Sequence, residues 1–385
     1  MLAGLLFSLT ALPAAAQLPH LMPPGSAWLD VNYPKLFWTP RDGITGGGYL
    51  AFVRQLDFEN ADSPAPYSAA IAIDGQLSTS GSRQLVLEGR FPAFVNGWRF
   101  ALTLEGQRRA RDNYFGIGEN TVNDESFVTS AQPRFYEARY NRMFARGEVQ
   151  RTVAGGLRAL AGFHAERWKI QTPTVGLSRL TLDQAANLDP RIGLATGDVS
   201  FRFGLVYDTR DDELAANRGV LIQGIYGIGN TDVSYTRSTI SLQAYRMVGE
   251  NLGLAVRGMA QGMGGTPRLG TYYSVDVSDR PYAALGGSMS HRALAENRFL
   301  GRDKLLFNFD ARYHVVNLPR AARVSLLGFL DAGRVFQAES FTLKGLRVGG
   351  GTGAFIQVGR AGIVGTTIGY GPDGLSMDFT TKWTF

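Results

Sequence analysis

The C-terminal segment Leu375-Ser-Met-Asp-Phe-Thr-Thr-Lys-Trp-Thr-Phe385 alternates between two kinds of side chain. Apolar side chains dominate its odd positions, whereas every even position is polar. A period of two indicates a strand with one dry face and one wet face. Charge on the wet face and aromatic rings on the dry face are typical of a barrel strand between lipid and an aqueous lumen. An edge strand of a soluble sandwich would alternate in the same way, so this segment alone leaves both folds open.

Repetition of the pattern favours the barrel. Lys304 to Val316 and Val199 to Asp208 alternate in the same way, and about sixteen such segments lie between Pro34 and Phe385, an even number as in single-chain bacterial barrels. Beyond the N-terminal segment, no apolar run is long enough for a membrane-spanning helix. A chain without such helices can span a membrane only as a closed barrel. We therefore predict an all-β fold, a transmembrane antiparallel β-barrel of about 16 strands.

The N-terminus predicts export. Met1 to Ala16 is apolar and ends in Ala14-Ala15-Ala16, which resembles the cleavage site of a secretory signal peptide. A buried N-terminal helix is the alternative, since no Lys or Arg precedes the apolar run. We predict a signal peptide at residues 1–16, a short periplasmic leader at 17–33 and the barrel at 34–385. The expected location is the outer membrane of a Gram-negative-type bacterium.

The connections between strands differ in length. Short polar turns are expected on the periplasmic side at Arg146 to Val149, Met247 to Asn251 and Val358 to Ala361. Long segments rich in Gly, Asn, Asp and Pro are expected outside the cell or folded back into the lumen, at Arg108 to Gln132, Thr172 to Gly197 and Gly264 to Asp303. Within the second of these, Leu180 to Ala186 is expected to form a short helix.

Composition excludes several function classes. The formal net charge is +6, but the Arg residues are dispersed along the chain, so no nucleic-acid partner is expected. The chain has no Cys, its four His residues lie outside metal-ligand spacings, and no Gly-x-Ser-x-Gly segment occurs. We expect no metal, no cofactor and no enzymatic activity. A lumen site built from His314 and a Ser is the weak alternative.

Four patches together resemble the Omp85 superfamily, also called the bacterial surface antigen D15 family. Tyr207-Asp208-Thr209-Arg210-Asp211 followed by Arg218-Gly219 resembles a periplasmic turn of that family. Gly286 to Gly301 is similar to the loop that carries the family's Arg-Gly-Phe/Tyr signature, here Arg292-Ala293-Leu294. Phe329-Leu330-Asp331-Ala332-Gly333 matches Phe-x-Asp-x-Gly, and the last strand, with Trp383 and Phe385, is similar to the family's C-terminal assembly signal.

Strand parity predicts a contact between two of these patches. In the alternation of this strand, Asp331 lies on the same face as Gly333, and the other face is apolar. The side chain of Asp331 is therefore expected to face the lumen. A loop folded inward before the twelfth strand could place Arg292 against Asp331, with Asp310 as a second acceptor, and Gly333 would leave room for the loop. In the family, the equivalent Arg engages the equivalent Asp and fixes the loop to the wall. The alternative is that Arg292 is a solvated loop charge.

The resemblance implies a role in insertion or translocation of protein or lipid, through a weak seam between the first and last strands. Larger family members carry periplasmic POTRA domains, and residues 17–33 are too few for one, so a separate periplasmic partner is expected. The other expected partners are outer-membrane lipid, lipopolysaccharide and the barrel assembly machinery. The alternative function is a passive pore or structural barrel whose surface loops bind a ligand.

Overall fold

The computed structural model describes residues 28–39, 41–56, 63–189, 191–230, 234–278, 281–318, 322–337, 341–359, 362–380 and 383–385. The expected signal peptide at residues 1–16 and most of the expected leader at 17–33 lie outside these ranges. No helix in the described part of the chain is long and apolar enough to cross a membrane.

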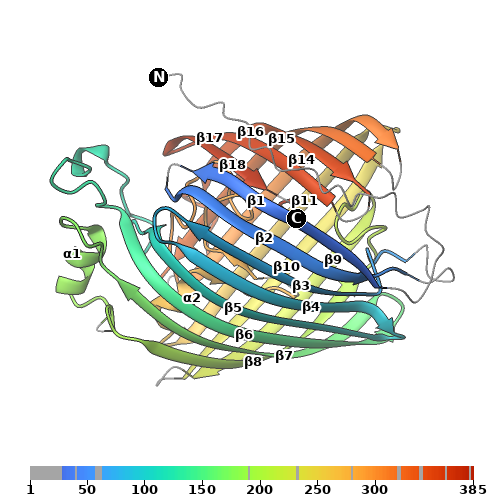
Figure 1. The fold of residues 1–385 in the computed structure, drawn as a ribbon, viewed down its shortest axis with the longest axis horizontal. Helices are drawn as coiled ribbons and strands as arrows, with labels where there is room; N and C mark the ends of the chain where they lie inside the picture. Colours follow the sequence, from blue (N-terminus) through green and yellow to red (C-terminus); the bar gives the residue numbers. More distant parts are fainter. Residues whose placement is uncertain are drawn as a thin grey trace.

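The fold is one antiparallel sheet of sixteen strands that follow one another in chain order, as predicted (Figure 1). The strands are β1 (Trp28–Thr39), β2 (Gly43–Arg54), β3 (Ala69–Ser78), β4 (Arg83–Val95), β5 (Trp98–Asn113), β6 (Glu137–Ala154), β7 (Leu157–Gln171), β8 (Thr196–Asp208), β9 (Gly219–Asn230), β10 (Ser234–Val248), β11 (Leu252–Gly265), β14 (Asp303–Leu318), β15 (Ala322–Phe336), β16 (Arg347–Val358), β17 (Gly362–Gly371) and β18 (Gly374–Thr380).

The two faces of the sheet are inverted relative to a water-soluble protein. In β14, Asp310 and Arg312 are buried on the inner face, whereas Phe307, Phe309 and Tyr313 are exposed on the outer face. A soluble sandwich would bury the aromatic face, so the burial pattern decides between the two folds that alternation left open. Apolar residues facing outward and polar residues facing inward are the arrangement of a barrel in lipid.

The three longest connections lie at the same end of the barrel, because each follows an odd-numbered member of the sixteen strands. They span residues 114–136, 172–195 and 266–302. The second contains α1 (Arg179–Ala185), where a helix was predicted, and the hydroxyl of Ser178 caps it by accepting a hydrogen bond from the N–H of Thr181 at 3.1 Å. The first contains a 3-10 turn at Glu125–Phe127.

One predicted turn is wrong. Arg146 to Val149 lies inside β6, and the turn to β7 is formed by Gly155 and Gly156, of which Gly155 has a φ of +50°. A left-handed backbone conformation favours Gly. The turn therefore lies at the Gly155-Gly156 pair and not at the polar segment 146–149. The polar residues at 146–149 face the lumen instead.

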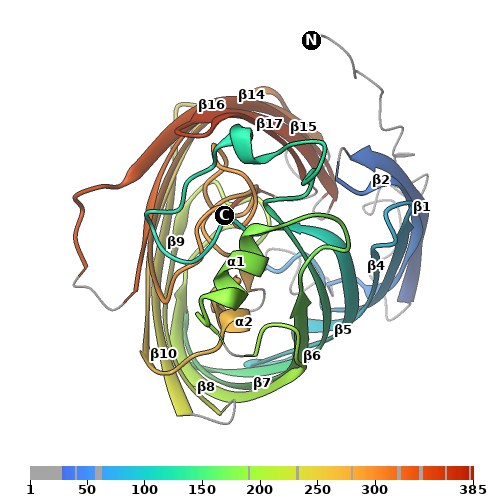
Figure 2. The ribbon, with the colours of Figure 1, turned by 90° about the vertical axis from the view of Figure 1, so that its left-hand side faces the viewer.

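The sheet has two free edges. The strand order begins with β1 and ends with β18, and among the described residues no ladder pairs these two strands. β1 begins at Trp28, earlier than expected, and pairs with β2 along twelve residues. The shorter of the two strands at the seam is β18, with seven described residues. Figure 2 shows β1 and β2 at one side of the ring and the C-terminal strands at the other side of the break.

The chain leaves the sheet before its C-terminus, contrary to the prediction that the last strand extends to Phe385. β18 ends at Thr380, and the last described residues, 383–385, lie inside the barrel, where Trp383 is 5% exposed. Figure 2 places the C-terminus within the ring of strands.

Candidate functional site

The connection from β11 to β14, residues 266–302, folds into the barrel, and we call it the lumen loop. It contains α2 (Leu269–Tyr272) and a small hairpin of β12 (Ser274–Val275) and β13 (Tyr282–Ala283). Most of its described residues from 284 to 301 are buried, and Figure 2 shows α2 within the ring. The loop therefore fills part of the lumen as an inward-folded plug.

Arg292 of the lumen loop contacts two carboxylates of the wall. Its Nε and Nη2 atoms donate to the two oxygens of Asp331 at 2.9 and 2.7 Å, and its Nη1 atom lies 2.7 Å from Asp310 Oδ1. The backbone N–H of Arg292 also donates to Asp331, at 2.7 Å. Two adjacent strands, β14 and β15, thus supply a fork that matches the planar guanidinium. The structure brings together the three charged residues that the sequence paired.

Each carboxylate of this buried cluster contacts at least one guanidinium group. Arg312 on β14 lies 2.8 Å from Asp310, so two guanidinium groups face two carboxylates. Burial alone would lower the pKa of Arg292, but Asp310 and Asp331 outweigh this effect and raise it. An uncompensated charge at this depth would be costly, and the cluster therefore depends on all of its members.

Glycines in the wall leave room for the loop at the residue after Arg292. A Cβ atom on Gly371 would lie 2.4 Å from the carbonyl oxygen of Ala293, and one on Gly349 would lie 2.4 Å from Ala293 Cβ. At the predicted site residue Gly333, a Cβ atom would lie 2.4 Å from a methyl carbon of Leu285. Because the lumen loop lies this close to the wall, β15, β16 and β17 carry Gly at these positions of their inner face. The loop tip packs closely with Ala293 and Leu294, both of which are buried.

A second buried charge cluster was not predicted. Asp276 of the lumen loop lies 2.5 Å from Arg202 on β8, and Arg202 also contacts Glu148 on β6. Arg146 is 3.4 Å from Asp276. Burial raises the pKa of Asp276, but Arg202 and Arg146 outweigh burial and lower it to about 2. The period-two alternation of Arg146, Glu148 and Gln150 was the available signal, which the turn-like composition of this segment obscured.

The predicted periplasmic turn connects β8 to β9. Arg210 donates to both oxygens of Asp208, at 2.9 and 3.0 Å, and Asp211 accepts hydrogen bonds from the N–H groups of Asn217 and Arg218. Gly219 has a φ of +99°, and a Cβ atom there would lie 2.2 Å from the carbonyl oxygen of Thr209. The four residues therefore fix the shape of this turn.

The C-terminal residues pack against lumen arginines. The ring of Trp383 stacks on Phe355 of β16, and the guanidinium of Arg312 lies 4.2 Å from the centre of the Trp383 ring. Arg312 also donates to the carbonyl oxygen of Phe385 at 3.0 Å. Since Arg312 contacts Asp310 as well, the C-terminus and Arg292 share one electrostatic cluster.

Comparison with known proteins gives the family. The Omp85 superfamily domain matches residues 71–363, which is most of the chain. The chain belongs to the Omp85 superfamily. A comparison with curated protein sequences finds no match.

Solved structures of other proteins have a similar fold. BamA from Haemophilus ducreyi lacking POTRA domains 1–3 has a TM-score of 0.52 and 13% identity over 93% of this chain and 69% of that chain. CdiB from Escherichia coli has a TM-score of 0.56 and 13% identity over 91% of this chain and 61% of that chain. CdiB from Acinetobacter baumannii has a TM-score of 0.50 and 11% identity over 91% of this chain and 58% of that chain. The chain thus spans less than two thirds of either CdiB, and at these identities the likeness concerns the fold.

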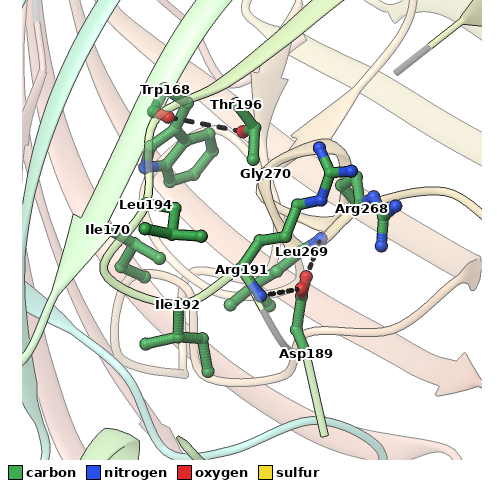
Figure 3. A pocket seen from close by; sticks show the side chains of 10 residues that line it. All are labelled: Trp168, Ile170, Asp189, Arg191, Ile192, Leu194, Thr196, Arg268, Leu269 and Gly270. Carbon is green, nitrogen blue, oxygen red and sulfur yellow. Dashed lines mark hydrogen bonds between the residues drawn. The ribbon is translucent and has the colours of Figure 1, made fainter. Parts of the chain in front are cut away.

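Two cavities border the lumen loop of this Omp85 barrel. Figure 3 shows the smaller one, of about 20 Å³, where Asp189 accepts hydrogen bonds from the N–H groups of Arg191 and Leu269. It has room for about one water molecule. The larger cavity, of about 310 Å³, lies between the wall of β4 to β7 and the lumen loop, and Arg109, Arg142 and Glu296 are among its lining residues. Among the described residues, no group of three or more His, Asp or Glu side chains could hold a metal ion.

Proposed function

We propose that this Omp85 barrel acts in the insertion or translocation of protein or lipid at the outer membrane, by opening the seam between β1 and β18. The observation that carries this proposal is the pair of free strand edges. A strand edge presents unpaired N–H and C=O groups, which can template the pairing of another strand. In a membrane such groups must find partners, and an incoming chain could supply them.

The short last strand supports this proposal. Within the described residues, the ladder between β17 and β18 has seven residue pairs, from Gly365 with Thr380 to Gly371 with Gly374. Because Trp383 and Phe385 pack against side chains inside the barrel, they add nothing to the seam. Since β18 has seven residues and β1 has twelve, a ladder between these two strands would contain few backbone hydrogen bonds to break on opening.

The proposed function requires contacts of the barrel with the outer membrane, with the assembly machinery and with a periplasmic partner. Its outer face would contact outer-membrane lipid and lipopolysaccharide, and the barrel assembly machinery would insert the chain after export through the signal peptide. We further propose a separate periplasmic partner that delivers the substrate to the seam. Co-purification with periplasmic proteins after crosslinking in cells tests this partner.

A catalytic role is not part of the proposal. His314 does contact a Ser, since its Nδ1 atom lies 2.8 Å from Ser325 Oγ, and both residues are buried in the wall. Within the described residues, the Nε2 atom of His314 has no hydrogen-bond partner, so the third group that orients a catalytic His is missing there. This pair is better explained as a hydrogen bond between β14 and β15.

A passive pore is the second candidate, favoured by the cavity of about 310 Å³ beside the lumen loop. Two measurements on the purified protein separate the candidates, namely conductance in a planar bilayer and insertion of an unfolded small barrel protein into liposomes. Seam opening predicts that liposomes with the protein insert the test barrel about tenfold faster than liposomes with an unrelated closed barrel. Steady large conductance without faster insertion would support the pore and overturn the seam.

A further inference from the structure

One tight turn of the lumen loop reaches both sides of the seam. It spans residues 295–298 and is closed by a hydrogen bond from the N–H of Arg298 to the carbonyl oxygen of Ala295, at 3.1 Å. Asn297 at its centre has a φ of +55°, one of two described residues other than Gly with a positive φ. Asn tolerates this conformation better than most residues. Glu296 and Arg298 lie on either side of Asn297 in this turn and contact different partners.

Glu296 binds the N-terminal side of the seam. Its Oε2 atom accepts a hydrogen bond from Arg41 Nη2 at 2.7 Å, and Arg41 belongs to the turn between β1 and β2. The carbonyl oxygen of Glu296 accepts a second hydrogen bond, from Asn113 at the end of β5, at 2.8 Å. Burial raises the pKa of the Glu296 carboxyl, but Arg41 and Arg109 outweigh burial and lower it. The first hairpin is thereby tied to the lumen loop.

Arg298 binds the C-terminal side of the seam. Its Nε atom donates to Asp373 at 2.5 Å, and Asp373 belongs to the turn between β17 and β18. Two further hydrogen bonds, both 2.9 Å long, join its Nη atoms to Thr121. In β18 itself, the hydroxyl of Ser376 donates to the carbonyl oxygen of Arg292 at 2.6 Å. The last hairpin is thereby tied to the same loop.

We propose that residues 292–298 of the lumen loop form a clasp that holds the two edge hairpins together where no ladder of the described residues pairs them, so that the seam opens when the clasp is released. This inference rests on the proposed opening of the seam. It assigns a regulatory role to Glu296 and Arg298, whereas the side chain of Arg292 anchors the loop to β14 and β15.

The two halves of the clasp differ in burial. The side chains of Arg41 and Glu296 are 27% and 34% exposed, whereas those of Arg298 and Asp373 are 3% and 16% exposed. Solvent weakens an ion pair, so the contact of Arg41 with Glu296 is the one that breaks first. Opening would therefore move the β1–β2 hairpin away while β18 stays with the loop.

Hydrogen–deuterium exchange of the full chain in lipid nanodiscs tests the clasp. Glu296→Gln is expected to speed exchange of the β1 and β2 amides about tenfold, and Arg298→Gln is expected to do the same for β17 and β18. The matched control is Glu166→Gln, which removes a 2.8 Å ion pair with Arg142 between two strands that are already paired. This control is expected to leave exchange at the seam unchanged.

The outcomes separate the clasp from the proposed function. Faster exchange confined to the seam hairpins supports the clasp, whether or not the protein inserts other barrels. Unchanged exchange at the seam in both variants overturns it, even if insertion activity is found. A uniform rise across all strands in both single variants overturns it as well, because the two residues would then support the whole barrel instead of the seam.

Discussion

The ring of Trp383 stacks on the ring of Phe355, with centroids 4.1 Å apart and planes inclined by 21°. Phe355 lies on the inner face of β16, so this contact holds the C-terminus inside the barrel. The hydroxyl of Thr384 donates to the carbonyl oxygen of Ser288 in the lumen loop at 2.9 Å. The plug of this barrel therefore consists of two segments, the lumen loop and the last residues of the chain.

Replacing Trp383 tests the second segment of the plug. Trp383→Ala is expected to lower the free energy of unfolding by about 3–5 kcal/mol, because a buried aromatic ring is lost. Unfolding in detergent, followed by gel mobility with increasing temperature, measures the change. Trp38→Ala is the control, since Trp38 is 61% exposed on β1 and its loss in detergent should cost much less. Equal losses in the two variants would contradict an inward C-terminus.

Replacing Arg292 tests the anchor of the lumen loop. Arg292→Ala leaves Asp310 and Asp331 buried with too little positive charge, and we expect a loss of about 3–5 kcal/mol of stability. Arg246→Ala, at an exposed position of β10, is the matched control and should change stability by less than about 0.5 kcal/mol. The same gel assay applies. If the Arg292 variant melts with the wild type, the contact does not anchor the loop.

Replacing a wall glycine tests the close approach of the loop. Gly371→Ala would place a Cβ atom 2.4 Å from the backbone oxygen of Ala293, so the loop must shift. We expect a cost of about 1–3 kcal/mol and faster proteolysis of the lumen loop. Gly328→Ala on β15 is the control, because a Cβ atom there meets nothing within 4 Å. Proteolysis that is equally slow in both variants would argue against tight docking.

The docked lumen loop should respond to pH through His291. Burial lowers the pKa of this His below its usual value of 6.5, and its Nε2 atom lies 2.9 Å from the carbonyl oxygen of Arg347. A pKa that is lower in the folded state means that the stabilising contribution is complete above about pH 6.5 and decreases as the pH falls below that value.

Protease sensitivity of the loop between pH 8 and pH 5, set as approximate limits around that pKa, measures this effect. Sensitivity should rise toward the acidic end in the wild type. His291→Gln retains a hydrogen-bond donor but does not titrate, so its sensitivity should vary less with pH. A pH profile that is the same in both proteins would assign the response to other groups.

Much of this structure follows from local pattern. A period of two identifies each strand and its lipid face, and the parity of Asp331 places its carboxylate in the lumen. The resemblance to the Omp85 loop signature indicated Arg292 as its partner, and the pairing is physically reasonable because a buried carboxylate requires a cation. The alternation of lipid-facing and lumen-facing side chains repeats along every strand, which is why sixteen strands could be counted from the sequence.

The predictions that failed concern segments whose structure is set by contacts with residues distant in sequence and not by the local alternation of side chains. Residues up to Phe385 keep the alternation, but the lumen arginines Arg257 and Arg312 offer Phe385 cation–π contacts at 5.0 and 5.5 Å that no local pattern reveals. At Arg146, turn-like composition hid a partner more than a hundred positions away, Asp276. The contacts of Glu296 and Arg298 depend on the turn at Asn297 and were not predicted.

The hydrogen bond between Arg41 and Glu296 joins residues 255 positions apart. Contacts between residues so distant in sequence form late and slow the folding of a chain. The first hairpin can acquire this contact only after the lumen loop has been synthesised and folded inward. An assembly intermediate that already has most of its strands paired would therefore still lack the contact that ties the N-terminal hairpin to the lumen loop, which leaves this edge of the sheet accessible to a catalyst of membrane insertion.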